Sequence, residues 1–228
     1  MALTNYIRTS LHEMFEYLRN PQENISMSYQ PKSIFRSYSA AITMLVAMFL
    51  TILIVMVLLC LCCPNLTHST LISDISKYPW WVVAILGPIV EELNCRLSLV
   101  RKNALLACSL TIACFNVISR CAFAKEFYTM DFIWARIGVS VVVGTALFLA
   151  CRKWLMRCDY RLYFYAWAFL FGIVHITRID FGTLLPLDYV VVLLYLAKQF
   201  CMGILLGYVR MKNGIASSIV LHILNNAL

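Results

Sequence analysis

The sequence predicts an all-α fold: a polytopic transmembrane helical bundle of about seven spans with a cytoplasmic N-terminus. Three observations predict it: the composition, the order of the apolar segments and the distribution of the basic residues. Of the 228 residues, 62% are hydrophobic and 13% are charged, and the mean hydropathy is +0.80. A soluble domain is nearer half apolar and a quarter charged. The polar, acid-containing N-terminus lacks the apolar region of a cleavable signal peptide.

The chain divides into three regions. Residues 1–38 are predicted to form a cytoplasmic leader with an amphipathic helix around Leu11–Leu18, whose apolar side chains recur at helical spacing and are expected to lie on the membrane surface. Residues 39–79 contain the first transmembrane helix and an outer loop, and residues 80–228 form the main membrane domain. The predicted spans are Ala40–Cys63, Trp80–Val100, Ala104–Phe123, Phe132–Ala150, Tyr163–Ile176, Tyr189–Val209 and Ile215–Leu228.

The basic residues alternate along these spans. With the N-terminus inside, the inner segments hold 12 of the 19 Lys and Arg residues and the outer loops hold 3. This bias toward the inner side predicts a multi-pass cell-membrane protein, and it explains the net charge of +8 without a nucleic-acid partner. The four remaining basic residues lie within spans: Arg96, Arg120, Arg136 and Lys198.

Three mostly apolar stretches carry polar residues at a four-residue spacing. An ionised side chain at the centre of a bilayer costs about 2.5–3.5 kcal/mol, so such residues indicate a functional site. Counting from the nearest inner basic residue, Glu91 and His222 each lie ~15 Å deep and His175 ~21 Å deep. The three helices are therefore expected to bring these side chains to one level near the midplane. The stretches are Glu91–Glu92–…–Arg96, Phe171–…–His175 and His222–…–Asn226.

Helical spacing also predicts which side chains face each other. Glu92 and Arg96 are neighbours at i,i+4 and can form an ion pair that neutralises the charge. Glu91 is rotated by ~100° from Glu92, which leaves it to face a cavity.

With these three motifs in this order, the chain resembles the CAAX-protease and bacteriocin-processing family, the Abi or Rce1-like intramembrane glutamate proteases. That family is marked by EExxxR, FxxxH and HxxxN on separate transmembrane helices, and the likeness covers roughly residues 80–228. The sequence ends two residues after Asn226, and additional helices of larger eukaryotic relatives are not recognised. The expectation is therefore a bacterial-type member in a cytoplasmic membrane, in preference to one in the endoplasmic reticulum.

Chemistry and resemblance together imply an intramembrane endopeptidase. Glu91 and His175 would activate a water, and His222 and Asn226 would stabilise the oxyanion. Glu92, Arg96 and Phe171 would support them. No cofactor is expected, although zinc bound by Glu91, His175 and His222 is a less favoured alternative. The expected substrate is a membrane-embedded or lipidated peptide or protein in the lipid bilayer, cut near its end.

Two other classes of function stay open. A non-catalytic membrane regulator or scaffold would use the same polar residues to bind a partner. A proton-coupled transporter would use the midplane Glu and His as a relay, but inverted repeats and discontinuous helices are not evident. The loops carry no signal for the identity of a substrate or for an oligomeric state.

Overall fold

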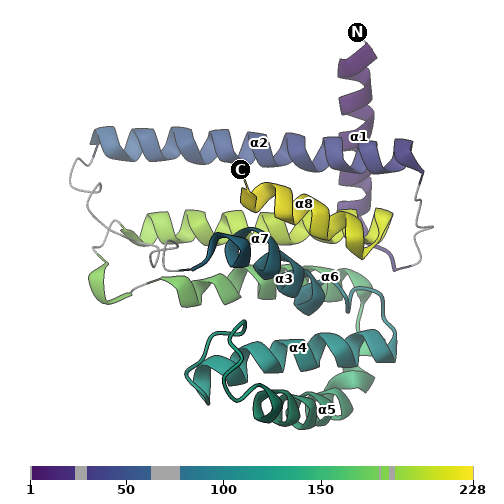
Figure 1. Ribbon diagram of the computed structural model, residues 1–228. Helices are drawn as coiled ribbons and strands as arrows, with labels where there is room; N and C mark the ends of the chain where they lie inside the picture. The colour runs from purple at the N-terminus through teal and green to yellow at the C-terminus, as the bar shows by residue number, and fades with distance from the viewer. Residues whose placement is uncertain (1, 24–29, 63–77, 180, 185–187, 228) are drawn as a thin grey trace.

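The chain is a bundle of α-helices, and the prediction of an all-α fold is confirmed (Figure 1). The computed structural model describes residues 2–23, 30–62, 78–179, 181–184 and 188–227, and within them it contains no strand. The helices are α1 (Ala2–Arg19), α2 (Pro31–Cys62), α3 (Gly87–Cys95), α4 (Asn103–Cys121), α5 (Ile133–Arg157), α6 (Tyr160–Val174), α7 (Asp188–Asn213) and α8 (Ile215–Ala227). A π-helical turn, Val82–Leu86, precedes α3, and two 3₁₀ turns, His175–Arg178 and Phe181–Thr183, follow α6.

Four of the described helices, α2, α4, α5 and α7, are long and apolar enough to cross a membrane, so the chain is a membrane protein. Three other predicted spans correspond to the shorter helices α3, α6 and α8. Helix α8 has 13 residues, or about 20 Å at 1.5 Å per residue, against a hydrocarbon core of about 30 Å. The number of spans and the division of the chain into three regions stay predictions.

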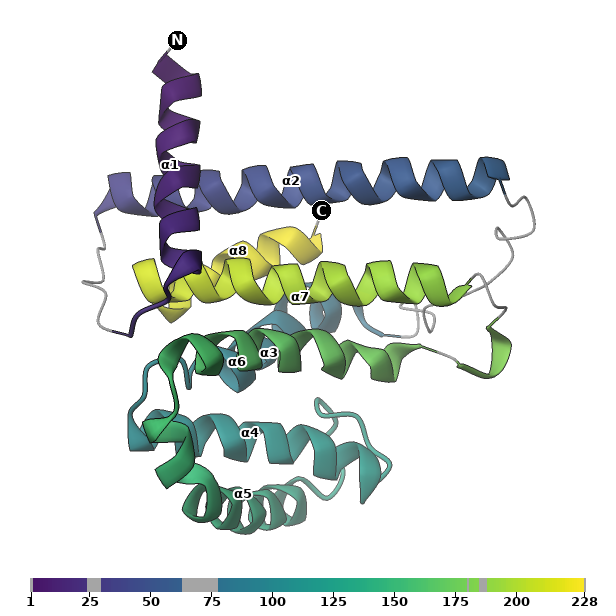
Figure 2. The ribbon, with the colours of Figure 1, turned by 180° about the vertical axis from the view of Figure 1, so that it is seen from behind.

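The predicted inner segments meet at one end of the bundle, here called the basic end. There α2, α4, α6 and α8 begin while α5 and α7 end (Figures 1 and 2). Contacts between distant segments hold this end together. Asn213 at the end of α7 accepts a hydrogen bond from Ser37 near the start of α2, and the hydroxyl of Tyr160 donates to the carbonyl of Leu99. The charge alternation therefore matches the topology, and the side of the membrane stays a prediction.

Helix α1 runs across the direction of α2 and α7 in both views (Figures 1 and 2). It is amphipathic as predicted, but part of its apolar face packs on protein where lipid was expected. Met14 is fully buried, and the ring of Tyr17 lies 5.6 Å from that of Phe164 and 5.5 Å from that of Tyr208. Phe15 stays exposed. The helix is therefore docked on α2, α6 and α7 at the basic end.

Glycines let the helices that carry the site approach closely. A Cβ atom at Gly203 of α7 would lie 2.7 Å from the carbonyl oxygen of Ala168 in α6. One at Gly172 of α6 would lie 3.1 Å from the backbone nitrogen of Phe200. Between α7 and α8, Gly214 has a φ of 89°, a left-handed conformation that favours glycine and lets the chain reverse within one residue.

Arg136, predicted to lie within a span, is buried at the start of α5 and organises the turn from α4. Its Nε donates to the hydroxyl of Ser119 at 2.9 Å, and its Nη atoms donate to the carbonyls of Glu126 and Thr129 at 2.8 and 2.7 Å. The guanidinium of Arg136 is therefore satisfied by hydrogen bonds within this turn. This explains one of the four basic residues that the sequence places inside apolar segments.

Candidate active site

Three helices that are far apart in sequence bring Glu91, His175 and His222 together. Oε2 of Glu91 lies 3.8 Å from Nε2 of His175 and 3.6 Å from Nε2 of His222. The two imidazoles are 6% and 4% exposed, and Glu91 is 22% exposed. One carboxylate oxygen thus faces two buried ring nitrogens, and part of the Glu91 side chain is accessible from outside.

A widened turn positions the glutamates. Residues Val82–Leu86 form π-helix, and the N–H of Gly87 donates to the carbonyl of Val82, five residues earlier. A Cβ at Gly87 would lie 2.9 Å from that same oxygen, so this geometry suits glycine. Pro88, which follows, has no N–H to donate into an α-helical ladder. Such π-bulges are frequent at functional sites, and here one lies a single turn before Glu91.

The end of α6 orients His175. Nδ1 of His175 donates to the carbonyl oxygen of Phe171 at 2.7 Å, because only a proton on nitrogen can bond a carbonyl. Nε2 is thereby turned toward Glu91. The ring of Phe171 lies 4.9 Å from that of His175 and 5.8 Å from that of His222. Phe171 therefore contacts both histidines of the site.

The second glutamate is enclosed by two partners. Nε of Arg96 lies 3.5 Å from Oε1 of Glu92, with both side chains at most 2% exposed, which is the i,i+4 pair that the spacing predicts. The same oxygen accepts a hydrogen bond from Nδ1 of His222 at 3.1 Å. Sequence reasoning missed this second contact. Cζ of Arg96 also lies 3.8 Å from the centre of the Phe171 ring, so the guanidinium stacks on the ring that contacts both histidines.

Asn226 lies one turn beyond His222 on α8 and is exposed. Its Nδ2 donates to the carbonyl of Val83 in the π-helical turn at 3.2 Å, and its Oδ1 accepts from Asn225. Among the described contacts, Asn226 therefore bonds the turn before α3 and none of the three clustered side chains. An amide has two N–H donors, and one of them is used by Val83.

Two further residues border the cluster without belonging to any of the three motifs. The ring of Tyr195, on α7, lies 6.3 Å from that of His175, and Val83 supplies the carbonyl that Asn226 bonds. Neither carries a signal in the sequence, because one is an ordinary aromatic residue in an apolar helix and the other contributes only backbone.

The cluster contains the donor types of a zinc site, one carboxylate and two imidazoles. Within the described part of the chain, however, no group of three or more His, Cys, Asp or Glu is arranged to hold a metal ion. The expectation that the site needs no cofactor, and the zinc alternative, both stay predictions from the sequence.

A comparison with known protein families gives a match. The family model described as type II CAAX prenyl endopeptidase Rce1-like matches residues 75–228. This range includes α3 to α8 and all the site residues named above, and it leaves α1 and α2 outside. No curated protein and no solved structure matches the chain.

Proposed function

Because the chain belongs to the Rce1-like family of type II CAAX prenyl endopeptidases, we propose that it hydrolyses a peptide bond near the end of a membrane-embedded or lipidated substrate, using a water activated by Glu91. Membership implies a CAAX-type intramembrane endopeptidase and a membrane-associated peptide substrate in general terms. The bond that is cut and the residues that act belong to the proposal. A bacterial cytoplasmic membrane as its location is still a prediction from the sequence.

One observation carries the proposal: Oε2 of Glu91 lies within 3.8 Å of the Nε2 atoms of both His175 and His222. At 3.8 Å the Glu91–His175 separation exceeds a direct hydrogen bond and suits a water bonded to both groups. Since Nδ1 of His175 donates to Phe171, Nε2 of the neutral ring keeps a lone pair that can accept from this water.

The reaction then follows ordinary acid–base chemistry. Glu91 takes one proton of the water while the water oxygen forms a bond to the scissile carbonyl carbon. The carbonyl oxygen becomes an oxyanion. Glu91 returns the proton to the amide nitrogen as the C–N bond breaks. The products are a carboxylic acid and an amine, and Glu91 ends as it began.

His222 and Asn226 are proposed to stabilise the oxyanion. Because Nδ1 of His222 already donates to Glu92, Nε2 can donate to an oxyanion only when the ring carries both protons. The carboxylate of Glu92 stabilises that charged ring. The second N–H of Asn226 supplies the other donor, and donors of this kind are most effective away from water.

The test compares Glu91→Gln with the wild-type protein, first by peptidomics of cells and then with the purified protein in lipid nanodiscs. The substitution keeps shape and removes the base, so we expect turnover to fall by about 100-fold or more with substrate binding retained. Glu16→Gln, which changes an exposed acid on α1, is the matched control and should leave the peptide profile unchanged.

Other outcomes point to the alternative functions. Identical peptide profiles for wild type and Glu91→Gln would remove the support for a peptidase. A phenotype that survives the substitution would indicate a scaffold. A loss of solute flux with no peptide cut by either protein would indicate a transporter.

A further inference from the structure

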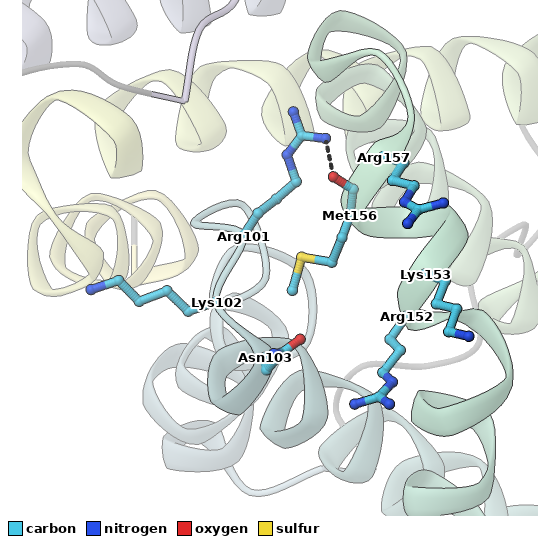
Figure 3. A pocket seen from close by; sticks show the side chains of 7 residues that line it. All are labelled: Arg101, Lys102, Asn103, Arg152, Lys153, Met156 and Arg157. Atoms are coloured by element: carbon cyan, nitrogen blue, oxygen red, sulfur yellow. Dashed lines mark hydrogen bonds between the residues drawn. The ribbon is translucent and has the colours of Figure 1, made fainter.

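An open pocket of about 550 Å³ lies at the basic end, between the start of α4 and the end of α5 (Figure 3). It shares no residue with the candidate active site. Five of the seven described residues that line it are basic and none is acidic. The basic residues are Arg101, Lys102, Arg152, Lys153 and Arg157.

Arg101 forms a fixed wall of this pocket. Its Nε lies 3.0 Å from Oε2 of Glu23, which neutralises its charge. Its Nη1 donates to the carbonyls of Cys158 and Met156 at 2.7 and 3.3 Å, and Figure 3 shows the bond to Met156. These carbonyls lie at the negative end of α5, where a cation is favourable. Arg101 therefore already satisfies the end of the helix.

The other four cations are not neutralised in this way, although Cζ of Arg152 lies 5.6 Å from the centre of the Phe148 ring. Lys102, Arg152, Lys153 and Arg157 form no ion pair with any acid in the described part of the chain. Figure 3 shows the three from α5 on one side of the pocket, with Lys102 on the other. Four like charges around one opening repel each other, and a bound anion would relieve that repulsion.

The start of α4 adds to the positive electrostatic potential of the pocket. The helix begins at Asn103 and has 19 residues, and no side chain caps its first turn. The backbone N–H groups of that turn carry partial positive charge. Together with the basic residues of α5 that line the same pocket, they favour an anion with several oxygen acceptors, such as phosphate.

The surroundings of the pocket indicate where this phosphate comes from. Helices α4 and α5 are both able to cross a membrane, and α5 exposes apolar side chains below the pocket, with Leu149 57% exposed. Trp154, beside Lys153, is 66% exposed. Tryptophan is enriched at the boundary between acyl chains and headgroups. The pocket therefore lies at the expected depth of lipid headgroups.

We propose that this pocket binds the phosphate headgroup of an anionic phospholipid, whose acyl chains lie along the exposed face of α5. Basic pockets between transmembrane helices are suited to such headgroups, and the volume is within the range of ligand sites. The proposal is independent of the reaction at Glu91.

The test uses the full-length protein in neutral detergent, titrated with phosphatidylglycerol or phosphatidylcholine, with bound lipid counted by native mass spectrometry. We expect the wild-type protein to retain phosphatidylglycerol preferentially. Replacing Arg152, Lys153 and Arg157 by Gln should weaken that binding by about 100-fold, since each cation near a membrane surface contributes about fivefold. Lys102→Gln with Lys153→Gln, both exposed, gives a milder variant that should lose about 25-fold if the triple variant unfolds.

The matched control removes three exposed cations outside the pocket, as Arg8→Gln, Lys32→Gln and Arg161→Gln, and should bind lipid as the wild type does. Equal losses in both triple variants would show diffuse attraction and overturn the proposal. So would an unchanged affinity in the pocket variants. Displacement of phosphatidylglycerol by millimolar inorganic phosphate would assign the pocket to a soluble anion and overturn the lipid assignment.

Discussion

Glu92 on α3 and His222 on α8 are joined by a buried hydrogen bond of 3.1 Å between Oε1 and Nδ1, across 130 positions of the sequence. The same oxygen faces Arg96. Glu92 therefore both balances the buried guanidinium and turns Nε2 of His222 toward Glu91. In the proposed reaction it would act through His222, as a positioning residue.

We predict that Glu92→Gln lowers both stability and turnover. Removing one partner of a buried ion pair leaves the other charge uncompensated, at about 3–5 kcal/mol, and loss of an orienting partner typically lowers activity by about 10- to 100-fold. Thermal unfolding and a comparison of kcat with KM measure the two effects. Glu13→Gln opens the exposed pair with Arg36 and should change neither. A fully active Glu92→Gln enzyme would show that His222 is held by other contacts.

Phe171→Leu tests the stack beneath the histidines. The substitution removes the ring over which Arg96 lies at 3.8 Å and keeps the backbone carbonyl that orients His175. Loss of a desolvated cation–π contact is expected to lower the free energy of unfolding by about 2 kcal/mol. The free-energy equivalent of the loss in turnover should be smaller than this. Phe169→Leu, at a half-exposed ring on the same helix, is the control. An equal loss of stability in both variants would mean that the loss comes from ring packing in α6 and not from the contact with Arg96.

Much of this site can be predicted from residue spacing within single helices. The rest depends on contacts between helices and cannot be predicted in this way. The i,i+4 rule predicts the pair of Glu92 with Arg96, because Glu92 lies on α3 and Arg96 is the C-cap residue that follows it. The bonds from His222 to Glu92 and from Asn226 to Val83 depend on how α8 is rotated against α3, which no local pattern records. Hydropathy likewise overestimates the length of α3, which has nine residues within the predicted span Trp80–Val100. It measures apolar content and does not detect the change from π-helical to α-helical hydrogen bonding at Gly87.

Gly203→Ala is expected to force α6 and α7 apart. The new Cβ would lie 2.7 Å from the carbonyl oxygen of Ala168, a backbone atom that cannot move alone. Overpacking of this kind costs about 1–3 kcal/mol, and it should also displace His175 at the end of α6 and lower turnover. The control is Gly138→Ala in α5, where nothing lies within 4 Å of the new Cβ. That variant should gain up to about 1 kcal/mol from helix propensity.

Chelation separates a water activated by Glu91 alone from one bound to zinc. Dialysis against EDTA and 1,10-phenanthroline is expected to leave peptidase activity within about twofold of the untreated protein, because general-base catalysis needs no metal. Metal content is measured on the same samples. An activity that falls with the zinc content and returns when zinc is added would support the zinc alternative, with Glu91, His175 and His222 as ligands.

Asn226→Ala tests the oxyanion donor on α8. We expect kcat to fall by about 100-fold with little change in KM, because an oxyanion donor acts in the transition state and hardly at all on bound substrate. The substitution also removes the bond to Val83, so the π-helical turn could shift and carry Glu91 with it. Asn226→Gln separates these effects: a longer amide can reach Val83 but misplaces the second N–H, so kcat should stay low while the unfolding temperature recovers. Asn225→Ala removes the hydrogen bond that Oδ1 of Asn226 accepts and leaves both N–H donors of Asn226 in place, so it should keep activity within about twofold. Equal rises in KM for Asn226→Ala and Asn225→Ala would assign the end of α8 to substrate binding and remove Asn226 from the oxyanion site.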